Sequence, residues 1–415
     1  MTTVRLRHLA RVNPLTPAFD RLSDDDELTF LPMEAVWPGS RLDISRSRRK
    51  ASVATGYTRF QDGDVLVPKI TPTFEASRAV LISGLLGGVG AGTTELHVLR
   101  AESQIDARFL LYVVNTHSFL KVGEAEMYGV AGQQRVPDSF LRDLPVELPP
   151  LEEQRRIADF LYAETARIDA LVAKRSEMSD LLALKRERVI ELALGLEHDS
   201  HIHDMVPLKY LVAGITVGIV ITPAKWYVES GGTPALRGLN VRSGAIDSRD
   251  LVRISDEGDA ENVKSRLKAG DVVVVRTGQA GAAAVVPPYL AGANCIDLIL
   301  VRPGRNMAPK YLEYVLNSQY AQAHVSEHAV GSIQAHFNIG SMKKIPIPSL
   351  PLVRQEEIVK LLDERVAALD ALQDKLQRQG RVLAERRQAL ITAAVTGQFD
   401  VSTASGRNVT EGITA

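Results

Sequence analysis

Basic side chains after two similar apolar segments are the first candidates for chemistry in this 415-residue chain. Lys69 lies just beyond the segment 64–67, Asp-Val-Leu-Val, and Arg276 follows the segment 272–275, Val-Val-Val-Val. Each apolar run follows a Gly-Asp turn, which is typical of a strand. A basic side chain that leaves a strand into a loop can reach a phosphate oxygen or a guanine edge. We therefore expect both residues to contact nucleic acid, with a solvated strand end as the alternative.

Two polar loops contain side chains of the kinds that pair with bases. The first loop has Gln133, Gln134 and Arg135 after Gly132, and the second has Gln334 and His336 after Gly331. Glutamine can bond to adenine through two hydrogen bonds, and arginine can bond to guanine in the same way. We expect both loops to lie near DNA, although a plain polar turn would have the same composition.

The densest basic cluster is SRSRRK, in the first half of the chain, with the charged residues Arg46, Arg48, Arg49 and Lys50. We expect it to clamp a phosphate backbone, with a surface loop as the alternative. The whole chain has a formal net charge of −1. That value argues against a protein that coats nucleic acid without sequence preference, because neutralising phosphates needs a surplus of Lys and Arg. Local clusters or basic partners would then supply the contacts.

The sequence lacks the motifs of a catalytic centre. A methyltransferase would carry Asp, Asn or Ser before Pro-Pro-Tyr, but the segment 286–289 begins with a valine, which cannot accept the required hydrogen bond. No phosphate-binding loop of the type G-x-x-x-x-G-K-[ST] occurs. The histidines His198, His201 and His203 form no zinc pattern with a single cysteine. We expect no catalytic residue, no metal and no cofactor.

The composition is that of a globular protein, with 45% hydrophobic and 24% charged residues. At roughly 100–200 residues per domain, the length suggests two or three domains. Cys295 is the only cysteine, which fits a reducing cytoplasm. The first residues contain no apolar core of signal-peptide length, and no run of about 18 apolar residues occurs. We expect a cytoplasmic protein without a membrane segment.

The elements that position these side chains occur twice. Residues 148–161, LPPLEEQRRIADFL, match residues 349–362, SLPLVRQEEIVKLL, at an offset of 201. The same offset holds without insertion or deletion as far as Ile190 and Ile391. Upstream, the segments at 4–10, 60–69 and 107–116 match later ones at offsets of 202, 207 and 202. Each half therefore has a portion of variable length followed by a portion of constant length.

The constant portions are predicted to be long helices. Pro150 and Pro351 mark their starts, and Gly195 and Gly397 mark their ends. About 45 residues at ~1.5 Å rise make a rod of nearly ~70 Å, which is longer than a small domain is wide. An apolar residue every seven positions predicts a coiled coil. The expected seam consists of Leu161, Ile168, Leu171, Leu182, Val189, Leu362, Leu369, Leu372, Leu376, Leu383 and Leu390. The alternative is two ordinary amphipathic helices, each packed on its own domain.

The variable portions combine strand-like runs, short helical segments and glycine-rich loops, which favours an α+β domain in each half. The fold class is thus two tandem pseudo-symmetric α+β domains separated by two long antiparallel coiled-coil helices. The expected parts are a first domain at 1–148, a helix at 149–197, a linker at 198–205, a second domain at 206–348, a helix at 349–399 and a flexible tail at 400–415.

This arrangement resembles the specificity subunits of type I restriction-modification systems over about residues 4–400. The resemblance is carried by the pairs PPLEEQRRIADFL and LPLVRQEEIVKLL, QDGDVLVPK and KAGDVVVVR, and FLLYVVNT and YLEYVLNS. The pattern Leu-Pro-Leu-x-x-Gln-x-x-Ile at the start of a long helix, present twice in closely related form, is a specific signal of this family.

The resemblance implies a DNA-recognition subunit without catalysis. Each variable domain would read one half of an asymmetric bipartite site in double-stranded DNA, and the helices would set the spacer. The helices would also dock two methyltransferase subunits, and restriction subunits would join the full complex. Two alternatives from other classes remain: a coiled-coil scaffold without DNA specificity, and a nuclease or methyltransferase, which the missing motifs count against.

Overall fold

A computed structural model describes residues 2–37, 41–130, 132–196, 203–329 and 337–402. The chain divides into two compact units, Met1–Glu177 with Leu376–Ala415, and Met178–Lys375. We call them unit 1 and unit 2 and describe each by itself. Each unit contains one set of sheets and one stretch of each long helix.

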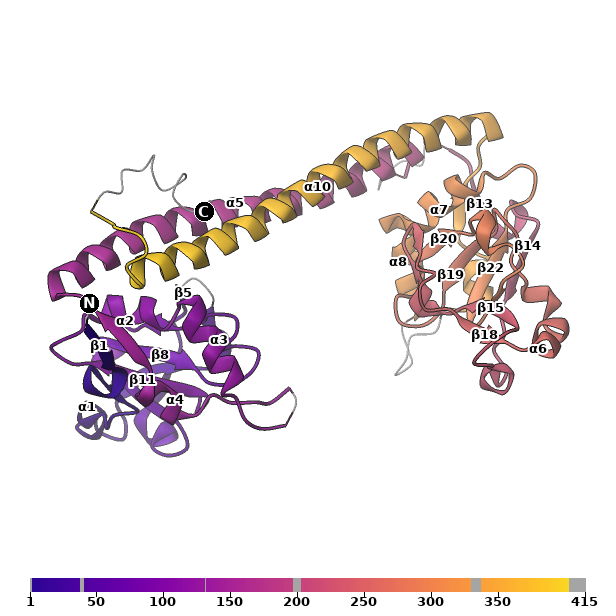
Figure 1. The fold of residues 1–415 in the computed structure, drawn as a ribbon. Helices are drawn as coiled ribbons and strands as arrows, with labels where there is room; N and C mark the ends of the chain where they lie inside the picture. Colours follow the sequence, from indigo (N-terminus) through magenta and orange to yellow (C-terminus); the bar gives the residue numbers. More distant parts are fainter. Residues whose placement is uncertain (1, 38–40, 131, 197–202, 330–336, 403–415) are drawn as a thin grey trace. The chain divides into compact units, whose positions relative to one another are not determined.

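Unit 1 is built on two four-stranded sheets, a two-stranded ribbon at 2–5 and 145–148, and one further two-stranded pair (Figure 1). The first sheet has the order β2 (Ala10–Val12), β11 (Leu96–Ala101), β8 (Asp64–Pro68), β9 (Val80–Leu81). The second has the order β6 (Ser47–Arg49), β3 (Glu27–Leu31), β10 (Val89–Gly92), β7 (Thr58–Gln61). Smaller pairs are β1 (Thr2–Arg5) with β12 (Pro145–Leu148), and β4 (Val36–Trp37) with β5 (Arg41–Leu42). The short helices are α1 (Pro17–Asp20), α2 (Ala107–Val113), α3 (His117–Ala125) and α4 (Asp138–Asp143).

Unit 2 repeats the first sheet and the ribbon. Its four-stranded sheet has the order β14 (Gly214–Val217), β22 (Leu298–Arg302), β19 (Val272–Val275), β20 (Ala283–Val285). A three-stranded sheet has the order β18 (Val252–Ile254), β15 (Thr233–Leu236), β21 (Asn294–Cys295). The pairs are β13 (Met205–Pro207) with β23 (Pro346–Pro348), and β16 (Val241–Arg242) with β17 (Ala245–Ile246). The short helices are α6 (Asp256–Glu261), α7 (Pro309–Asn317), α8 (Gln319–Ala329) and α9 (Ile339–Met342).

Two helices of 44 residues, α5 (Leu151–Leu194) and α10 (Leu352–Val395), confirm the expected long helices. Gly195 and Gly397, both with positive φ, follow their ends as C-terminal caps. Within unit 1, Asp169 pairs with Arg387 at 3.0 Å and Arg175 with Gln379 at 3.2 Å. The partner number falls as the α5 number rises, so the helices run antiparallel there.

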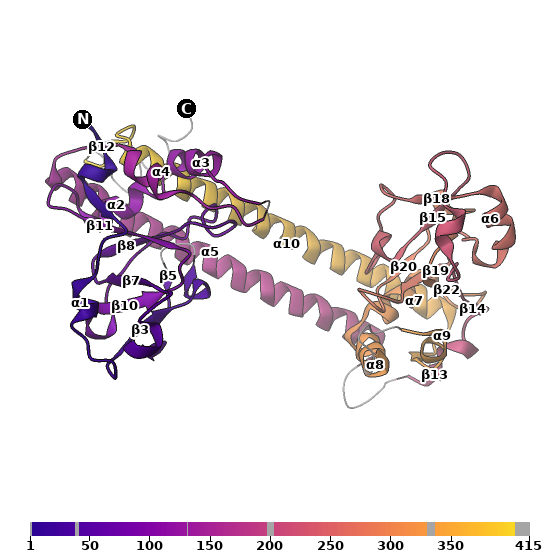
Figure 2. The same cartoon turned by 90° about the horizontal axis from the view of Figure 1, so that it is seen from below.

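In unit 2 the same helices are again antiparallel. Ser179 is bonded to Gln373, and Arg186 Nε lies 3.0 Å from Asp370 Oδ1. The helices also pack on their domains, since Ile157 of α5 and Leu390 of α10 belong to the same core as Phe109 of α2 in unit 1. The ribbon shows α2 next to this part of the two long helices (Figure 2). The two expectations, a coiled coil and helices packed on domains, therefore hold together.

The seam is narrower and more polar than the sequence suggested. Residues at seven-residue spacing are buried or half-buried as expected: Leu161, Ile168, Leu182, Val189, Leu362, Leu369, Leu376, Leu383 and Leu390. Leu171 and Leu372, which were expected in the seam, are 41% and 42% exposed, and their place in the seam stays a prediction. The second seam position lies four residues after the first rather than three, and it is filled by residues such as Thr165, Gln373 and Gly380. Leu171 and Leu372, three residues after Ile168 and Leu369, lie at the side of the contact between the two helices.

A buried glutamine fastens the start of α5 to unit 1. Gln154 is fully buried, although its amide has several hydrogen-bonding atoms. Its Oε1 accepts the backbone N–H of Asp106 at 2.8 Å. Its Nε2 donates to the carbonyls of Gln104 at 3.0 Å and Pro149 at 2.9 Å. Asp106 is the N-cap residue of α2, and its side chain accepts hydrogen bonds from Arg108 N and Phe109 N. The Gln154 amide therefore joins α5 to the start of α2 (Figure 1).

Gln355 repeats these contacts in unit 2. Its Oε1 accepts the N–H of Ala308, the N-cap of α7, at 2.8 Å. Its Nε2 donates to Asn306 O at 3.0 Å and to Leu350 O at 2.8 Å. The two glutamines are 201 residues apart, and both are buried. The glutamine in the duplicated motif is therefore a structural clamp.

We predict that Gln154→Ala destabilises unit 1 by about 3 kcal/mol or more, because each buried group left without a partner costs about 1–3 kcal/mol. The substitution leaves an N–H and two carbonyls unpaired. Urea unfolding followed by far-ultraviolet circular dichroism measures the loss.

Gln377→Ala on α10 is the matched control, since Gln377 is exposed. It should change the free energy of unfolding by less than about 0.5 kcal/mol. Equal stabilities of the two variants would contradict the clamp.

Candidate nucleic-acid interface

The structure brings the expected basic residue and the first polar loop of unit 1 together. Lys69 follows β8, and its carbonyl accepts the N–H of Val136 at 2.8 Å. Next to it, Thr71 N donates to Gln134 O at 3.0 Å. Lys69, Gln134 and Arg135 therefore lie at one edge of the first sheet, where an open cavity of ≈ 350 Å³ is lined by Lys69 and Arg135.

A carboxylate that the sequence analysis missed holds Arg135. Arg135 Nε and Nη2 donate to Glu95 Oε2 and Oε1 at 2.9 and 2.8 Å, and Nη1 donates to Gln133 O at 3.2 Å. The hydrogen bonds from Arg135 hold the pKa of Glu95 below its usual range. Burial lowers the pKa of the Lys69 ammonium. Glu95 and Arg135 thus form a two-bond ion pair of defined geometry.

His97 joins the same cavity as a neutral ring. It is buried, and its Nε2 lies 2.9 Å from Val136 O while its Nδ1 lies 3.2 Å from Asn13 Nδ2. Asn13 Oδ1 accepts Val98 N, so the Asn13 amino group faces the ring. These partners favour the tautomer with the proton on Nε2, and burial lowers the pKa of His97.

Unit 2 has the same arrangement around Arg276. The Arg276 carbonyl accepts Phe337 N at 3.0 Å, as the Lys69 carbonyl accepts Val136 N in unit 1. Arg276 Nη1 donates to Asp297 Oδ1 at 2.6 Å, and Nε donates to Phe337 O at 3.4 Å. Phe337 directly follows the second polar loop, whose Gln334 and His336 lie outside the described residues.

The basic cluster lies elsewhere in unit 1, at the edge of the second sheet. Arg46 precedes β6, Arg48 and Arg49 lie in it, and Lys50 begins the short 3-10 helix that follows. Arg48 stacks on Phe30, with its Cζ 3.8 Å from the ring centre. Arg46 pairs with Glu34 at 2.9 Å, and Lys50 Nζ donates to Leu22 O at 2.6 Å.

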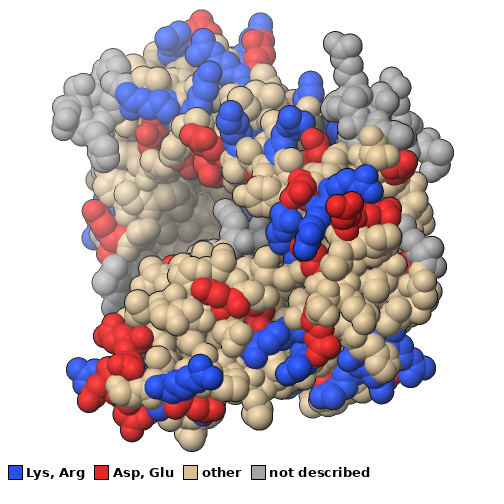
Figure 3. Space-filling view, turned by 90° about the vertical axis from the view of Figure 1, so that its left-hand side faces the viewer, with Lys and Arg blue, Asp and Glu red and all other residues tan. Residues whose placement is uncertain are grey.

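Arg49, also in the cluster, lies 3.8 Å from the Asp25 carboxylate and is largely exposed. On the face of the molecule in Figure 3, Lys and Arg side chains are interspersed with Asp and Glu. The chain has 49 Lys and Arg against 50 Asp and Glu, which gives the net charge of −1, and pairs of this kind reduce the local positive charge of the cluster.

Glu95 and Asp297 could have been found from the repeat. Each directly precedes the matching strand, β11 or β22, at an offset of 202, within ELHVLR and DLILVR. Glu95 and Asp297 were missed because the candidate DNA contacts were chosen among basic and amide side chains.

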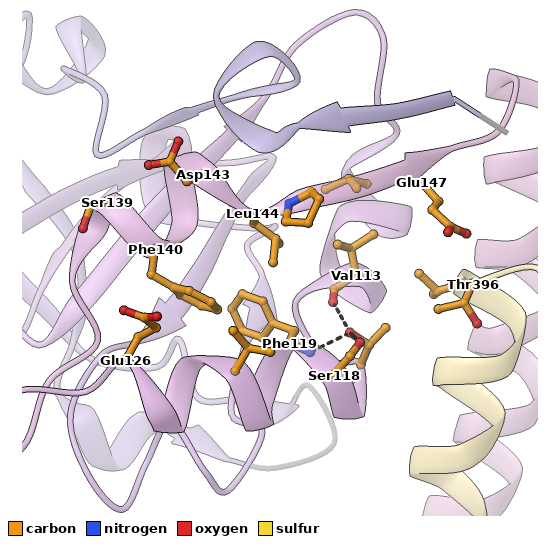
Figure 4. A pocket seen from close by; sticks show the side chains of 15 residues that line it. Val113, Ser118, Phe119, Glu126, Ser139, Phe140, Asp143, Leu144, Glu147 and Thr396 are labelled. Atoms are coloured by element: carbon orange, nitrogen blue, oxygen red, sulfur yellow. Dashed lines mark hydrogen bonds between the residues drawn. The ribbon is translucent and has the colours of Figure 1, made fainter.

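A second cavity, of ≈ 530 Å³, lies in unit 1 between α3, α4, β12 and the end of α10 (Figure 4). Phe119, Phe140 and Leu144 form its apolar wall. Among the described residues that line it there is no Ser–His or Cys–His pair.

The described residues also contain no cluster of three His, Cys, Asp or Glu side chains that would hold a metal ion. In the described ranges, every helix is too short or too polar to cross a lipid bilayer.

The profile of the family described as "Type I restriction modification DNA specificity domain" matches residues 89–177 and 229–379, more than half of the chain. The chain belongs to this family. The matched segments include Glu95 and Arg135 in unit 1 and Arg276 and Asp297 in unit 2. The resemblance inferred from the duplicated motifs is therefore confirmed.

Two relatives are specificity subunits from Escherichia coli. The chain is 38% identical over 197 residues to that of the type I restriction enzyme EcoAI, which is 46% of this chain and 32% of the relative. It is 41% identical over 158 residues to that of EcoEI, 37% of this chain and 26% of the relative. The chain thus spans about a third of the length of the EcoAI subunit and about a quarter of the length of the EcoEI subunit.

A solved structure described as the "structural basis underlying complex assembly and conformational transition of the type I R-M system" has the same fold. Its TM-score is 0.77 at 19% identity, with 96% of this chain and 98% of that chain covered. The likeness confirms the expected fold class, a mixed α and β architecture with long helices.

We predict that the His97 imidazole titrates below the ordinary value of 6.5, because burial favours its neutral form. The unfolded state then binds more protons than the folded state just below pH 6.5, so stability should fall as the pH drops through this range. Nuclear magnetic resonance of histidine-labelled protein measures the pKa, and the H97Q variant assigns the signal. A His97 pKa at or above 6.5 would contradict the burial of this ring.

Proposed function

We propose that this chain is the non-catalytic DNA-recognition subunit of a type I restriction-modification system, with each unit reading one half of an asymmetric bipartite site. The observation that carries this is the repeated sheet edge: the same backbone contact, Lys69 with Val136 and Arg276 with Phe337, carries different side chains. A shared frame positions the contacts, whereas sequence is read by side chains at base edges.

The candidate DNA contacts of unit 1 are Lys69, Gln133, Gln134 and Arg135, with Arg46, Arg48, Arg49 and Lys50 toward the phosphate backbone. Those of unit 2 are Arg276, Gln334 and His336. The basic cluster belongs to unit 1 only, which supports two unlike half-sites. The domain boundaries at 148, 206 and 348 remain part of this proposal. So does the cytoplasmic location, which fits the single cysteine.

The long helices supply the spacer and a docking surface for two methyltransferase subunits, and restriction subunits complete the complex. The gap-free offset of 201 supports a fixed length. On the unit 2 stretch of α5, Met178, Leu181 and Leu184 are 51%, 59% and 61% exposed. Apolar side chains this exposed on a helix are suited to a protein partner.

We predict that the purified chain transfers no methyl group and binds DNA weakly. Arg135 and Arg276, at the candidate contacts, are paired with carboxylates, and the net charge of the chain is −1. Addition of the methyltransferase subunits should give tight binding and site-specific methylation, measured by electrophoretic shift and by transfer of labelled methyl groups. Methylation by the isolated chain would contradict a non-catalytic role, and non-specific binding by the complex would favour the scaffold alternative.

We predict that the two half-sites are read independently. Replacing residues 1–148 with the same region of a relative should change one half-site and leave the other half-site and the spacer intact. Sequencing of methylated sites in cells with the complete system measures both halves. A chimera with two altered halves would show that recognition is not modular.

A further inference from the structure

Each unit holds one arginine against a carboxylate at the same point of the frame. Glu95 precedes β11 and Asp297 precedes β22, and these strands occupy the same place in sheets of the same order. The arginines come from different segments: Arg135 from the polar loop in unit 1, and Arg276 from the end of the shared strand in unit 2. The pairing recurs although the arginine has moved, so the carboxylate has a role of its own at this edge.

Among the described residues, the partners of each guanidinium leave some of its N–H groups without a hydrogen bond. An arginine side chain has five N–H donors. In Arg135, Glu95 takes two of them and Gln133 O takes one. Within the described part of the chain, one N–H on Nη1 and one on Nη2 of Arg135 have no hydrogen-bond partner. In Arg276, Asp297 and Phe337 engage Nη1 and Nε, and no described residue bonds to Nη2.

This arrangement suits guanine better than the other bases or a phosphate. Guanine presents two acceptors, O6 and N7, side by side in the major groove, and two parallel N–H groups match them. Adenine presents a donor next to N7, and thymine presents a single acceptor. A phosphate would be repelled by the carboxylate behind the guanidinium. The carboxylate can also accept a hydrogen bond from the N4 amino group of the paired cytosine.

We propose that each unit contains a guanine-binding site, formed by Arg135 with Glu95 in unit 1 and by Arg276 with Asp297 in unit 2. The arginine donates to O6 and N7 of a guanine in its half-site. Glu95 and Asp297 are positioning residues that fix the rotation of the guanidinium. This inference rests on the proposed function and adds the identity of one base pair in each half-site.

The test compares E95Q and D297N in the complete complex with methyltransferase subunits. Methylation rates are measured on duplexes in which each base pair of the wild-type site is replaced in turn. The wild type should disfavour replacement of one G·C pair in each half by roughly 10- to 100-fold. E95Q should reduce this discrimination to a few-fold in one half only, and D297N should do so in the other.

Two further variants separate base reading from folding and from phosphate contact. E102Q removes an exposed partner of Arg11 in unit 1 and should leave both halves unchanged. R135K keeps the charge but loses the two-pronged geometry, so it should lose guanine discrimination while keeping the salt dependence of binding. Thermal unfolding of each variant shows that it is folded.

Three results would overturn the inference. One is an E95Q complex that methylates all duplexes more slowly with unchanged discrimination, which would point to a structural or phosphate role. Another is a wild-type half-site without a specified G·C pair, which would leave the proposed function standing. The third is a wild-type complex without any sequence discrimination, which would overturn the proposed function as well.

Discussion

Each unit depends on one buried glutamine side chain that bonds to three backbone groups. Gln154 and Gln355 each join the first turn of a long helix to the N-cap of a shorter helix about fifty residues earlier in the chain. A buried amide with unmet hydrogen bonds is costly, so the three partners must stay in place together. The start of each long helix is therefore fixed relative to its own sheet, and an insertion next to the glutamine would break the clamp.

The shared frame and the variable surface have separate tasks. The frame also contains a second repeated pair: Arg100 Nε lies 2.7 Å from Asp64 in unit 1, and Arg302 faces Asp271 in unit 2 at 3.9 Å. Asp64 and Asp271 are both buried and lie at the starts of the matching strands β8 and β19, so these pairs stabilise the sheet rather than read DNA. The side chains that differ between the units lie at the other end of the same strand. There Lys69 follows β8 in unit 1, and Arg276 follows β19 in unit 2.

The sequence was most informative where a repeat constrained it. The helices follow from the gap-free offset, with proline before and glycine after each one, and the strands at 64–67 and 272–275 follow from the buried valine and leucine runs. The second seam position was harder to choose, because Leu171 and Leu372 fit a spacing of three residues as well as the more buried Thr165 and Gln373 fit a spacing of four. Only packing decides between the two.

The candidate site was predicted in part. Charge and residue type indicated Lys69, Arg135 and Arg276, and the structure brings Lys69 and Arg135 together. The repeat marks Glu95 and Asp297, but not their pairing with the two arginines, because the paired residues come from segments that are distant in sequence. Nor could His97 be identified as a neutral buried ring, since its partners Asn13 and Val136 lie far from it in sequence.

The central claim is that two units on one frame each read their own DNA sequence. Sequencing of methylated sites in cells that carry the complete wild-type system tests it most directly. The account predicts one asymmetric motif with two unlike specified segments, separated by an unspecified spacer of constant length. A single continuous motif, or a palindrome with identical halves, would contradict it.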